Sequence, residues 1–394
     1  MDKDIYTEKF LVMDFGDIHF GRGNTKDLYD EFEKNIIQFI VDNEKKLNMV
    51  VISGDYFDQE IKISSNNFYY AYSALEKVIW LCEKSNIAVR MIRGTATHDM
   101  NQVEAMGMIF KNYKVFRVIT KTESEVLQNG MKILYIPEEY PKNMTEYYND
   151  LIYSVPDNTY DMTFFHGTFD FQAFQNQVIE SEKNIESAPV WKSEDIIRIT
   201  KGPIAGGHIH VASDFKKKVF YHGSFSRSCF GEESPKGFNI FEYDTINNSF
   251  EYMFIENIDA PEYKDVDFDN IFLGYAGNIE SVFKELDTIS NEEGKKLFRI
   301  NIGNEISKNN PEIRKICADW ISNKTNITLN RVKGISLKTG KNEEDSKEEL
   351  EENQFAFLSD NKLDVCEKIK IFIEKTKGKV IDISDVQRSI AKED

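Results

Sequence analysis

The stretch over residues 10–19, FLVMDFGDIH, decides the fold, because an apolar run leads directly into glycine, aspartate and histidine. A near-continuous apolar run of this kind is typical of a strand that is buried on both faces. Asp17 and His19 stand two positions apart, so in an extended chain both side chains lie on one face and can hold one ion. The segment therefore predicts a buried strand that ends at a candidate ligand site.

Apolar runs of the same kind recur along the chain as far as about Tyr252. We expect strands over residues 10–15, 49–53, 87–93, 131–136, 161–165 and 204–206. Residues 27–46 and 66–84 carry apolar side chains at three- and four-residue spacing, which is typical of helices. Antiparallel strands with short turns are expected over 218–223, 237–244 and 250–257. This alternation of strands and amphipathic helices predicts a layered α/β architecture.

The composition divides the chain into four parts. Residues 1–258 hold the alternating pattern, and residues 259–335 are expected to form a small α+β capping domain. The elements expected in the capping domain are a strand near Phe272, helices near 279–286 and 311–322, and strands over 297–303 and 327–333. Residues 336–360 include the acidic run EEDSKEELEE and predict a flexible linker. Residues 361–394 regain apolar periodicity and predict short helices that either fold back on their own domain or dock on a partner chain.

The overall composition narrows the class of protein. The 394 residues are 41% hydrophobic and 13% aromatic, which is ample for a packed core and excludes disorder of the whole chain. The net charge of −18 weakens a nucleic-acid interpretation without excluding it, because metal ligands are themselves acidic. We expect no membrane helix and no signal peptide. The four cysteines have no CxxC spacing, so we expect a cytoplasmic protein without disulfides or a structural zinc.

The histidines are placed in a non-random way. Each of the six lies at or just past the carboxyl end of an expected strand, next to glycine or a carboxylate: His19, His98, His166, His208, His210 and His222. In open α/β sheets the carboxyl ends of the strands converge on one crevice, so these side chains are expected to meet there. Asp55 directly follows the expected strand over 49–53 and Gly54, which places a carboxylate at the same edge.

This ligand set favours one kind of chemistry. Imidazole and carboxylate ligands without thiolate favour Mn, Fe or Zn over Mg, Ca or Cu(I). Two such ions bridged by a carboxylate suit phosphoester hydrolysis, because they polarise the phosphoryl oxygens and lower the pKa of an attacking water. A further histidine can protonate or stabilise the leaving oxygen. Serine-nucleophile and nucleotide-binding enzymes are disfavoured, because GxSxG, GxxxxGK[ST] and GxGxxG are absent from the sequence.

The ordered series of these motifs resembles the calcineurin-like metallophosphoesterases. The motifs are Asp17-Ile18-His19, Gly54-Asp55-Tyr-Phe-Asp58, Gly94-Thr-Ala-Thr-His98-Asp99, His166 and Gly207-His208-Ile209-His210. Within that superfamily, the run YHGSFSRSCFGE over 221–232, followed by KGF over 236–238, is similar to SbcD-type DNA repair nucleases. The resemblance covers residues 10–255 by motif. It implies a four-layer sandwich of two mixed sheets flanked by helices, with a capping domain and a helical tail.

The resemblance also implies a role for each matching residue. The first metal would be held by Asp17, His19 and His210, the second by His166 and His208, with Asp55 bridging the two. His98 would act on the leaving group, with Asp99 orienting it and Asp58 in support. The family reads Gly-Asn-His-Asp where this chain is two residues longer. The hydroxyl of Thr97, or of Thr95, therefore stands where the family has an asparagine amide.

Three features have two interpretations each. His222 is either a contact to substrate phosphate or to a ligand, or else a turn residue before Gly223. Arg227 either touches DNA phosphate or makes a structural ion pair. The aromatic helix expected within residues 65–81 is either core or, as the family allows, a homodimer interface.

The resemblance implies an activity and partners. The activity is a two-Mn(II) nuclease, with Mg(II) or another divalent ion as an alternative, that cleaves DNA ends or breaks by exo- and endonuclease action. It implies an SMC-like ATPase of the SbcC type bound through residues 361–394, and a homodimer within a heterotetramer. Lys-, Asn- and Ile-rich usage indicates an AT-rich bacterial or phage genome. The alternatives are a metallophosphatase or phosphodiesterase on a non-DNA ester, and a scaffold subunit that has lost its second metal.

Overall fold

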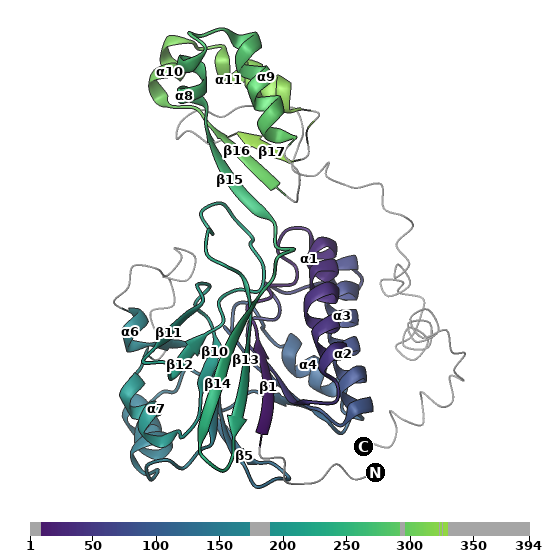
Figure 1. The fold of residues 1–394 in the computed structure, drawn as a ribbon, viewed down its shortest axis with the longest axis vertical. Coiled ribbons are helices and arrows are strands. Elements are labelled where there is room, and N and C mark those ends of the chain that lie inside the picture. Colours follow the sequence, from purple (N-terminus) through teal and green to yellow (C-terminus); the bar gives the residue numbers. More distant parts are fainter. Residues whose placement is uncertain (1–8, 174–189, 292–295, 323, 325, 330–394) are drawn as a thin grey trace, which may run out of the picture.

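The computed structural model describes residues 9–173, 190–291, 296–322, 324 and 326–329. Figure 1 shows a large body of sheets and helices and, beyond it, a smaller unit that the chain enters through β15 (Glu262–Asp267). The linker expected over 336–360 and the helical tail expected over 361–394 lie outside the described residues. Among the described residues, no helix combines the length and apolar character needed to cross a membrane.

The first sheet has six strands in the order β14-β13-β1-β2-β3-β4. Their bounds are β14 (Ser249–Glu256), β13 (Gly237–Asp244), β1 (Lys9–Phe15), β2 (Leu47–Ser53), β3 (Ala88–Ile92) and β4 (Phe116–Ile119). The strands from β1 to β4 are parallel, whereas β13 pairs antiparallel with β1 and β14 pairs antiparallel with β13. The apolar runs over 10–15, 49–53 and 87–93 therefore do form adjacent buried strands, as the sequence predicted.

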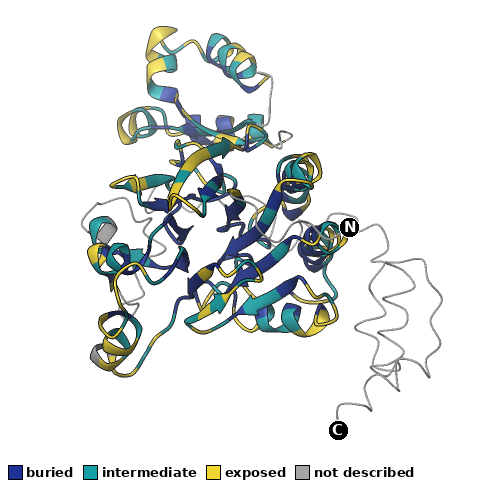
Figure 2. Cartoon of the chain, turned by 60° about the horizontal axis from the view of Figure 1, so that its bottom comes forward, coloured by how far each residue is buried: buried dark blue, intermediate teal, exposed yellow. Residues whose placement is uncertain are grey.

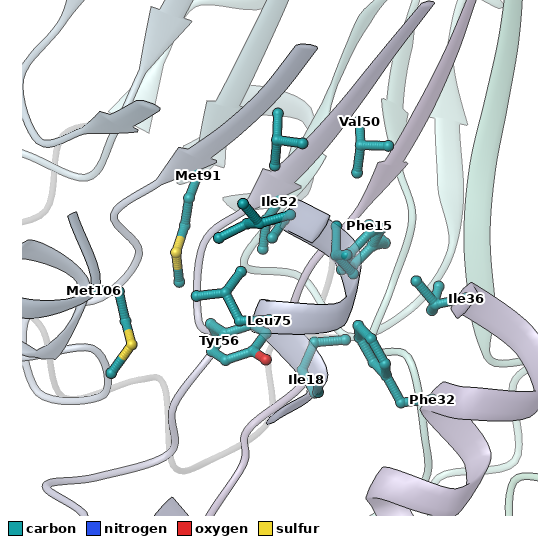
Figure 3. Close-up of a cluster of buried hydrophobic side chains, with 14 of the residues drawn as sticks. Phe15, Ile18, Phe32, Ile36, Val50, Ile52, Tyr56, Leu75, Met91 and Met106 are labelled. Atoms are coloured by element: carbon teal, nitrogen blue, oxygen red, sulfur yellow. The ribbon is translucent and has the colours of Figure 1, made fainter. Parts of the chain in front are cut away.

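Helices cover the outer face of this sheet. They are α1 (Thr25–Phe32), the π-helical turn η1 (Glu33–Ile37), α2 (Gln38–Asn43), α3 (Asn66–Ser85) and α4 (Gln102–Ile109). Helix α3 begins where the Ser65 side chain accepts a hydrogen bond from Phe68 N, and it ends at Asn86 in the left-handed conformation. Figure 3 shows Leu75 of α3 and Phe32 of α1 packed against Phe15 and Ile52 of the sheet. The aromatic helix thus contributes to the core, and a role in dimerisation stays a prediction.

The second sheet has the order β11-β12-β10-β7-β6-β5. Its strands are β11 (Ser213–Phe215), β12 (Val219–Tyr221), β10 (Ile204–Gly207), β7 (Met162–His166), β6 (Lys132–Ile136) and β5 (Glu123–Val126). The four central strands are parallel and the two outer strands antiparallel. Its outer face is covered by α5 (Met144–Tyr148), η2 (Asn149–Tyr153) and α7 (Ser193–Ile199). On the same face lie α6 (Asp170–Ala173) and a separate two-stranded sheet of β8 (Thr168–Phe169) and β9 (Val190–Trp191).

The two sheets pack face to face. Val12, Val51, Phe164, Ala205 and Phe220 belong to one buried apolar cluster between them. Figure 2 shows these inner strands as buried and the outer helices as a mixture of buried, intermediate and exposed residues. The protein is therefore a layered α/β sandwich of two mixed sheets with helices on both outer faces.

One topology expectation is wrong. Residues 218–223 were expected to form an antiparallel set with the two strands that follow. Instead β12 joins the second sheet, parallel to β10, while β13 and β14 form a hairpin at the edge of the first. The linking segment 222–236 crosses between the sheets, and local alternation of apolar residues carries no information on such a crossing.

The smaller unit has its own core. Its three strands β15, β16 (Lys296–Asn301) and β17 (Ile327–Leu329) form a parallel sheet in that order. The unit also contains four helices: α8 (Phe268–Gly274), α9 (Ile279–Ser290), α10 (Asn304–Asn309) and α11 (Ile313–Ile321). The strand expected near Phe272 is wrong, because that residue lies in α8. The side chain of Asp267 accepts a hydrogen bond from Asn270 N and starts this helix. The guanidinium of Arg299 lies 4.5 Å from the ring centre of Phe230, which joins the unit to the larger body.

Candidate metal centre

The candidate site lies where parallel strands of both sheets end. His166 is the last residue of β7, His208 directly follows β10, and the two strands are paired so that Gly207 faces His166. In the first sheet, the loops after β1 and β2 are held together by backbone hydrogen bonds. Asp17 N donates to the carbonyl of Gly54 at 3.0 Å, and His19 N to that of Asp55 at 3.1 Å. The two loops therefore present their side chains as one rigid unit.

Buried side chains fix the loops after β1 and β2 on the core. Ile18 and Tyr56 stand between or beside the candidate ligands, and both are almost fully buried in the core under the first sheet. Figure 3 shows both side chains within this apolar cluster. Each loop is thus anchored by buried side chains, Ile18 and Phe20 in one and Tyr56 and Phe57 in the other, while its polar neighbours turn towards the site.

The backbone is strained where the ligands turn. Asp17, His19, Asp55 and His208 have φ values of 46°, 55°, 46° and 97°, in a region that side-chain-bearing residues rarely adopt. Such strain persists when the surroundings enforce it, and it concentrates at functional sites. At Gly94, an added Cβ would lie 2.2 Å from Asp55 Oδ1, so only glycine permits this close approach. The loops therefore hold unfavourable backbone conformations that place the candidate ligands towards one another.

The first group of candidate ligands consists of Asp17, His19 and His210. Their ligand atoms lie within 4.8 Å of one another, and all three residues are buried. Nε2 of His19 lies 3.0 Å from Nε2 of His210, which in turn lies 4.0 Å from Asp17 Oδ1. Atoms that share an ion at about 2.1 Å lie roughly 3–4 Å apart, so these donors fit one metal ion.

The second group consists of Asp55, His166 and His208, and the Asp55 carboxylate also lies close to His19 of the first group. Oδ2 of Asp55 lies 3.4 Å from His166 Nε2 and 4.0 Å from His19 Nε2. One oxygen thus faces a ligand of each group. This is the position that a carboxylate bridging two ions would occupy, as the resemblance implied.

Neighbouring groups orient the imidazoles. Nδ1 of His166 donates to the carbonyl of Ser53 at 2.8 Å, which directs Nε2 at Asp55. Nδ1 of His19 lies 3.2 Å from an oxygen of Asp58, and Nδ1 of His210 lies 3.8 Å from one of Glu232. Carboxylates and carbonyls behind histidine ligands are the usual support of a metal site.

The electrostatics favour metal ligation. Burial lowers the pKa of His19, and burial together with the nearby His166 lowers the pKa of His208 to about 3, so both rings are neutral at pH 7. Burial opposes the charge of Asp55, but His166 and His19 hold its pKa well below the usual range. Neutral imidazoles around an ionised carboxylate are the forms that bind a cation.

His98 stands beside both groups. Its Nδ1 donates to the backbone carbonyl of Asp58 at 2.7 Å, and its ring centre lies 4.9 Å from that of His19. Because the carbonyl can only accept, Nδ1 carries the proton and Nε2 is the nitrogen that remains for chemistry. With 21% of its side chain exposed, His98 is more accessible than the candidate ligands.

The role expected of Asp99 is wrong. Its buried carboxylate accepts hydrogen bonds from the backbone N–H groups of Gly94 at 2.7 Å, Phe57 at 3.1 Å and Asp55 at 3.2 Å. Burial and the charge of Asp55 raise its pKa to about 7. Asp99 therefore fixes the loop that carries Asp55, whereas the carbonyl of Asp58 orients His98.

Of the two threonines, the structure brings Thr95 to the site and leaves Thr97 exposed. The amides of His98 and Asp99 bond back to the carbonyl of Thr95, and this tight turn directs Thr97 outward. Oγ1 of Thr95 lies 3.3 Å from His166 Nε2 and 3.4 Å from Nδ1 of His208. The expectation of Thr97 as a ligand is therefore corrected in favour of Thr95.

Sequence reasoning missed Glu138. It lies two residues beyond β6, is 2% exposed, and its Oε2 lies 3.4 Å from Nδ1 of His208. The sequence does carry a signal for this residue: Glu138 follows the expected strand over 131–136 by two positions, as Asp55 follows the expected strand over 49–53.

Of the interpretations of His222, the structure supports a contact to a candidate ligand residue. The side chain is fully buried, with Nδ1 3.9 Å from Asp17 Oδ2, so a contact to substrate phosphate is corrected to a position behind a candidate ligand. Arg227 is partly buried and donates to the carbonyls of Glu232 at 3.0 Å and Ser234 at 3.2 Å rather than forming the ion pair that was the alternative.

A cavity of about 540 Å³ extends from the first ligand group to the smaller unit. Asp17, His19 and His210 line one end, and Tyr263, Lys296 and Asn326 line the other. Arg22 and Arg227 lie along it. Arg22 was not expected from the sequence; its Nε lies 3.0 Å from Oδ1 of Asp58.

Comparison with known proteins gives no family. No family model matches the chain, and no curated protein matches it in sequence. Several solved structures match in part, and one of them, a crystal structure, is similar over 62% of this chain and 99% of its own, at 12% identity and a TM-score of 0.38. A likeness at that level assigns neither a fold family nor a function.

Proposed function

We propose that the protein is a two-metal phosphodiesterase of the calcineurin-like metallophosphoesterase type that cleaves DNA, as SbcD-type nucleases do. The observation that carries this proposal is the carboxylate of Asp55, whose Oδ2 faces His19 of one ligand group and His166 of the other. The order of the motifs in the sequence supports the same assignment.

The residues present fit two divalent ions. Each group combines imidazole nitrogens with carboxylate oxygens and no thiolate, which suits Mn(II), with Mg(II) or another divalent ion as alternatives. When bound, such ions would polarise the phosphoryl oxygens and lower the pKa of a nearby water.

The chain's own residues supply orientation and the proton. The carbonyl of Asp58 holds the Nδ1 proton of His98, so a proton on Nε2 is the one that can pass to the leaving oxygen. The same residue's carboxylate lies behind His19. Asp58 is therefore a positioning residue, and His98 is the candidate catalytic residue.

The cavity favours a polymeric substrate. It runs from the first ligand group past Arg22 and Arg227 to Lys296 of the smaller unit, so cationic side chains line it at several points, beside the carboxylates of Asp27 and Glu31. Cations of this kind hold a nucleic-acid backbone. We further propose that residues 361–394 bind an SMC-like ATPase and that α3 contributes to a homodimer.

A comparison of the activity on DNA with the activity on small phosphate esters tests the proposal. The purified chain with Mn(II) is given labelled linear duplex, labelled single strand and p-nitrophenyl phosphate esters, each with an EDTA control. Cleavage of DNA that EDTA abolishes is expected. Hydrolysis of the small esters with inert DNA, even when the ATPase and ATP are added, would instead support a phosphatase.

A further inference from the structure

Glu138 is a buried carboxylate beside the second ligand group. It is 2% exposed, and burying an ionised carboxylate is costly unless a cation or several hydrogen bonds compensate for the lost water. Its Oε1 accepts a hydrogen bond from the hydroxyl of Tyr140, and its Oε2 accepts one from Thr95 Oγ1 at 3.3 Å. Its Oε2 also lies 3.4 Å from Nδ1 of His208, whose ring is neutral.

Thr95 and His208 connect Glu138 to the second ligand group, whose mutually close members, within 4.8 Å of one another, are Asp55, His166 and His208 without Glu138. Thr95 Oγ1 lies 3.3 Å from Glu138 Oε2, 3.4 Å from His208 Nδ1 and 3.3 Å from His166 Nε2. Nε2 of His166 lies 3.4 Å from Asp55 Oδ2. Separations of roughly 3–4 Å are those of atoms that share one ion at about 2.1 Å.

We propose that Glu138 and Thr95 supply oxygen ligands to the second metal ion, with the Glu138 carboxylate in the role of the missing family asparagine. This inference rests on the proposed two-metal function. A carboxylate adds a full negative charge where the family has a neutral amide, so the second site holds a divalent ion despite the change at 94–99.

The second site would then have more oxygen ligands and more negative charge than the family's site. Asp55, Glu138 and Thr95 provide oxygens and His166 and His208 provide nitrogens, a mixture that hard divalent ions such as Mn(II) accept well. Loss of the carboxylate is therefore expected to weaken the second ion and to leave the first unaffected, because Asp17, His19 and His210 do not depend on Glu138.

The test counts bound Mn(II) on the full chain. Equilibrium dialysis gives the stoichiometry and the two dissociation constants, and electron paramagnetic resonance reports whether two Mn(II) ions are close enough to couple. The variants are Glu138→Ala and Glu138→Gln. The matched control is Glu139→Gln, because Glu139 bonds to Thr122 and Tyr147 outside the site.

Wild type and the control are expected to bind two coupled ions. Glu138→Gln should weaken the second ion about 10–100-fold, and Glu138→Ala should weaken it further and leave the signal of an isolated ion. Thermal unfolding without metal checks that each variant is folded. Two coupled ions of wild-type affinity in both variants would overturn the inference while leaving the two-metal function intact. Fewer than two ions in wild type would overturn both.

Discussion

The backbone carbonyl of Asp58 accepts a hydrogen bond from Nδ1 of His98 at 2.7 Å, while the carboxylate of Asp58 lies 3.2 Å from Nδ1 of His19. One residue thus orients a candidate metal ligand through its side chain and the candidate proton donor through its backbone. The two functions are separable by mutation, because a side-chain change leaves the carbonyl in place.

Replacing Asp58 by alanine is therefore expected to act on the metal. Loss of a carboxylate behind a histidine ligand should weaken the first Mn(II) about 10–100-fold, with the hydrogen bond of His98 retained. Mn(II) titration measures the effect, and saturating Mn(II) should restore most of the activity. A fall in kcat that excess Mn(II) does not restore would mean that Asp58 acts chiefly through His98.

His98→Ala is expected to separate chemistry from metal binding. A general acid contributes about 10²–10⁴-fold to the rate, so kcat on DNA should fall by that factor. The Mn(II) stoichiometry should stay at the wild-type value, because His98 belongs to neither of the two proposed ligand groups, although its ring lies within 4.8 Å of ligand atoms of His19 and Asp55. Loss of an ion in this variant would show that His98 is itself a ligand.

Asp99→Ala is expected to destabilise the fold. The change removes the acceptor of three backbone N–H groups, and each unsatisfied buried group costs about 1–3 kcal/mol of the free energy of unfolding. Urea denaturation measures the loss, with Asp150→Ala at an exposed position as the control. Asp99→Asn keeps one acceptor oxygen and should lose less. A stable but inactive Asp99→Ala protein would contradict this structural role.

Metal binding is expected to release a proton. Burial disfavours the charge of His166, but the carboxylate of Asp55 raises its pKa well above the usual value. An ion must displace the proton that this ring carries below its raised pKa, so affinity for Mn(II) should fall as the pH falls. Calorimetry in two buffers of different ionisation enthalpy counts the released proton. An affinity that is independent of pH would contradict the Asp55–His166 pairing.

Lys296→Ala is expected to weaken DNA binding uniformly. If Lys296 contacts phosphate, the slope of log affinity against log salt should fall by about 1. Lys132→Ala is the control, because Lys132 is exposed at the start of β6, away from the cavity. Equal effects of the two variants would show that the cavity is not the DNA path.

Much of the fold was predictable because it depends on local pattern. Apart from the buried Asp14 and Ser53, the strands over 10–15 and 49–53 are apolar on both faces, and the candidate ligands begin where the apolar runs stop. Asp17, His19 and Asp55 are therefore predictable as a group from periodicity and strand order alone. The motif order added the pairing with His208 and His210.

The rest depends on turns and crossings that periodicity does not encode. Thr95 rather than Thr97 faces the site because two amides bond back to its carbonyl. Glu138 reaches the site because β6 lies beside β7, a neighbour relation that the sequence does not state. His222 is buried because the chain crosses between the sheets directly after it.

The measurement that tests the central claim most directly is cleavage of a labelled linear DNA duplex by wild type and Asp55→Asn in Mn(II), with EDTA as the blank. A carboxylate that faces both ligand groups should be needed for both ions, so wild type is expected to cut and the variant to be inactive and to bind neither ion tightly. Wild-type protein that binds Mn(II) yet leaves DNA intact, with the ATPase and ATP present, would contradict the account. So would Asp55→Asn that cuts at the wild-type rate.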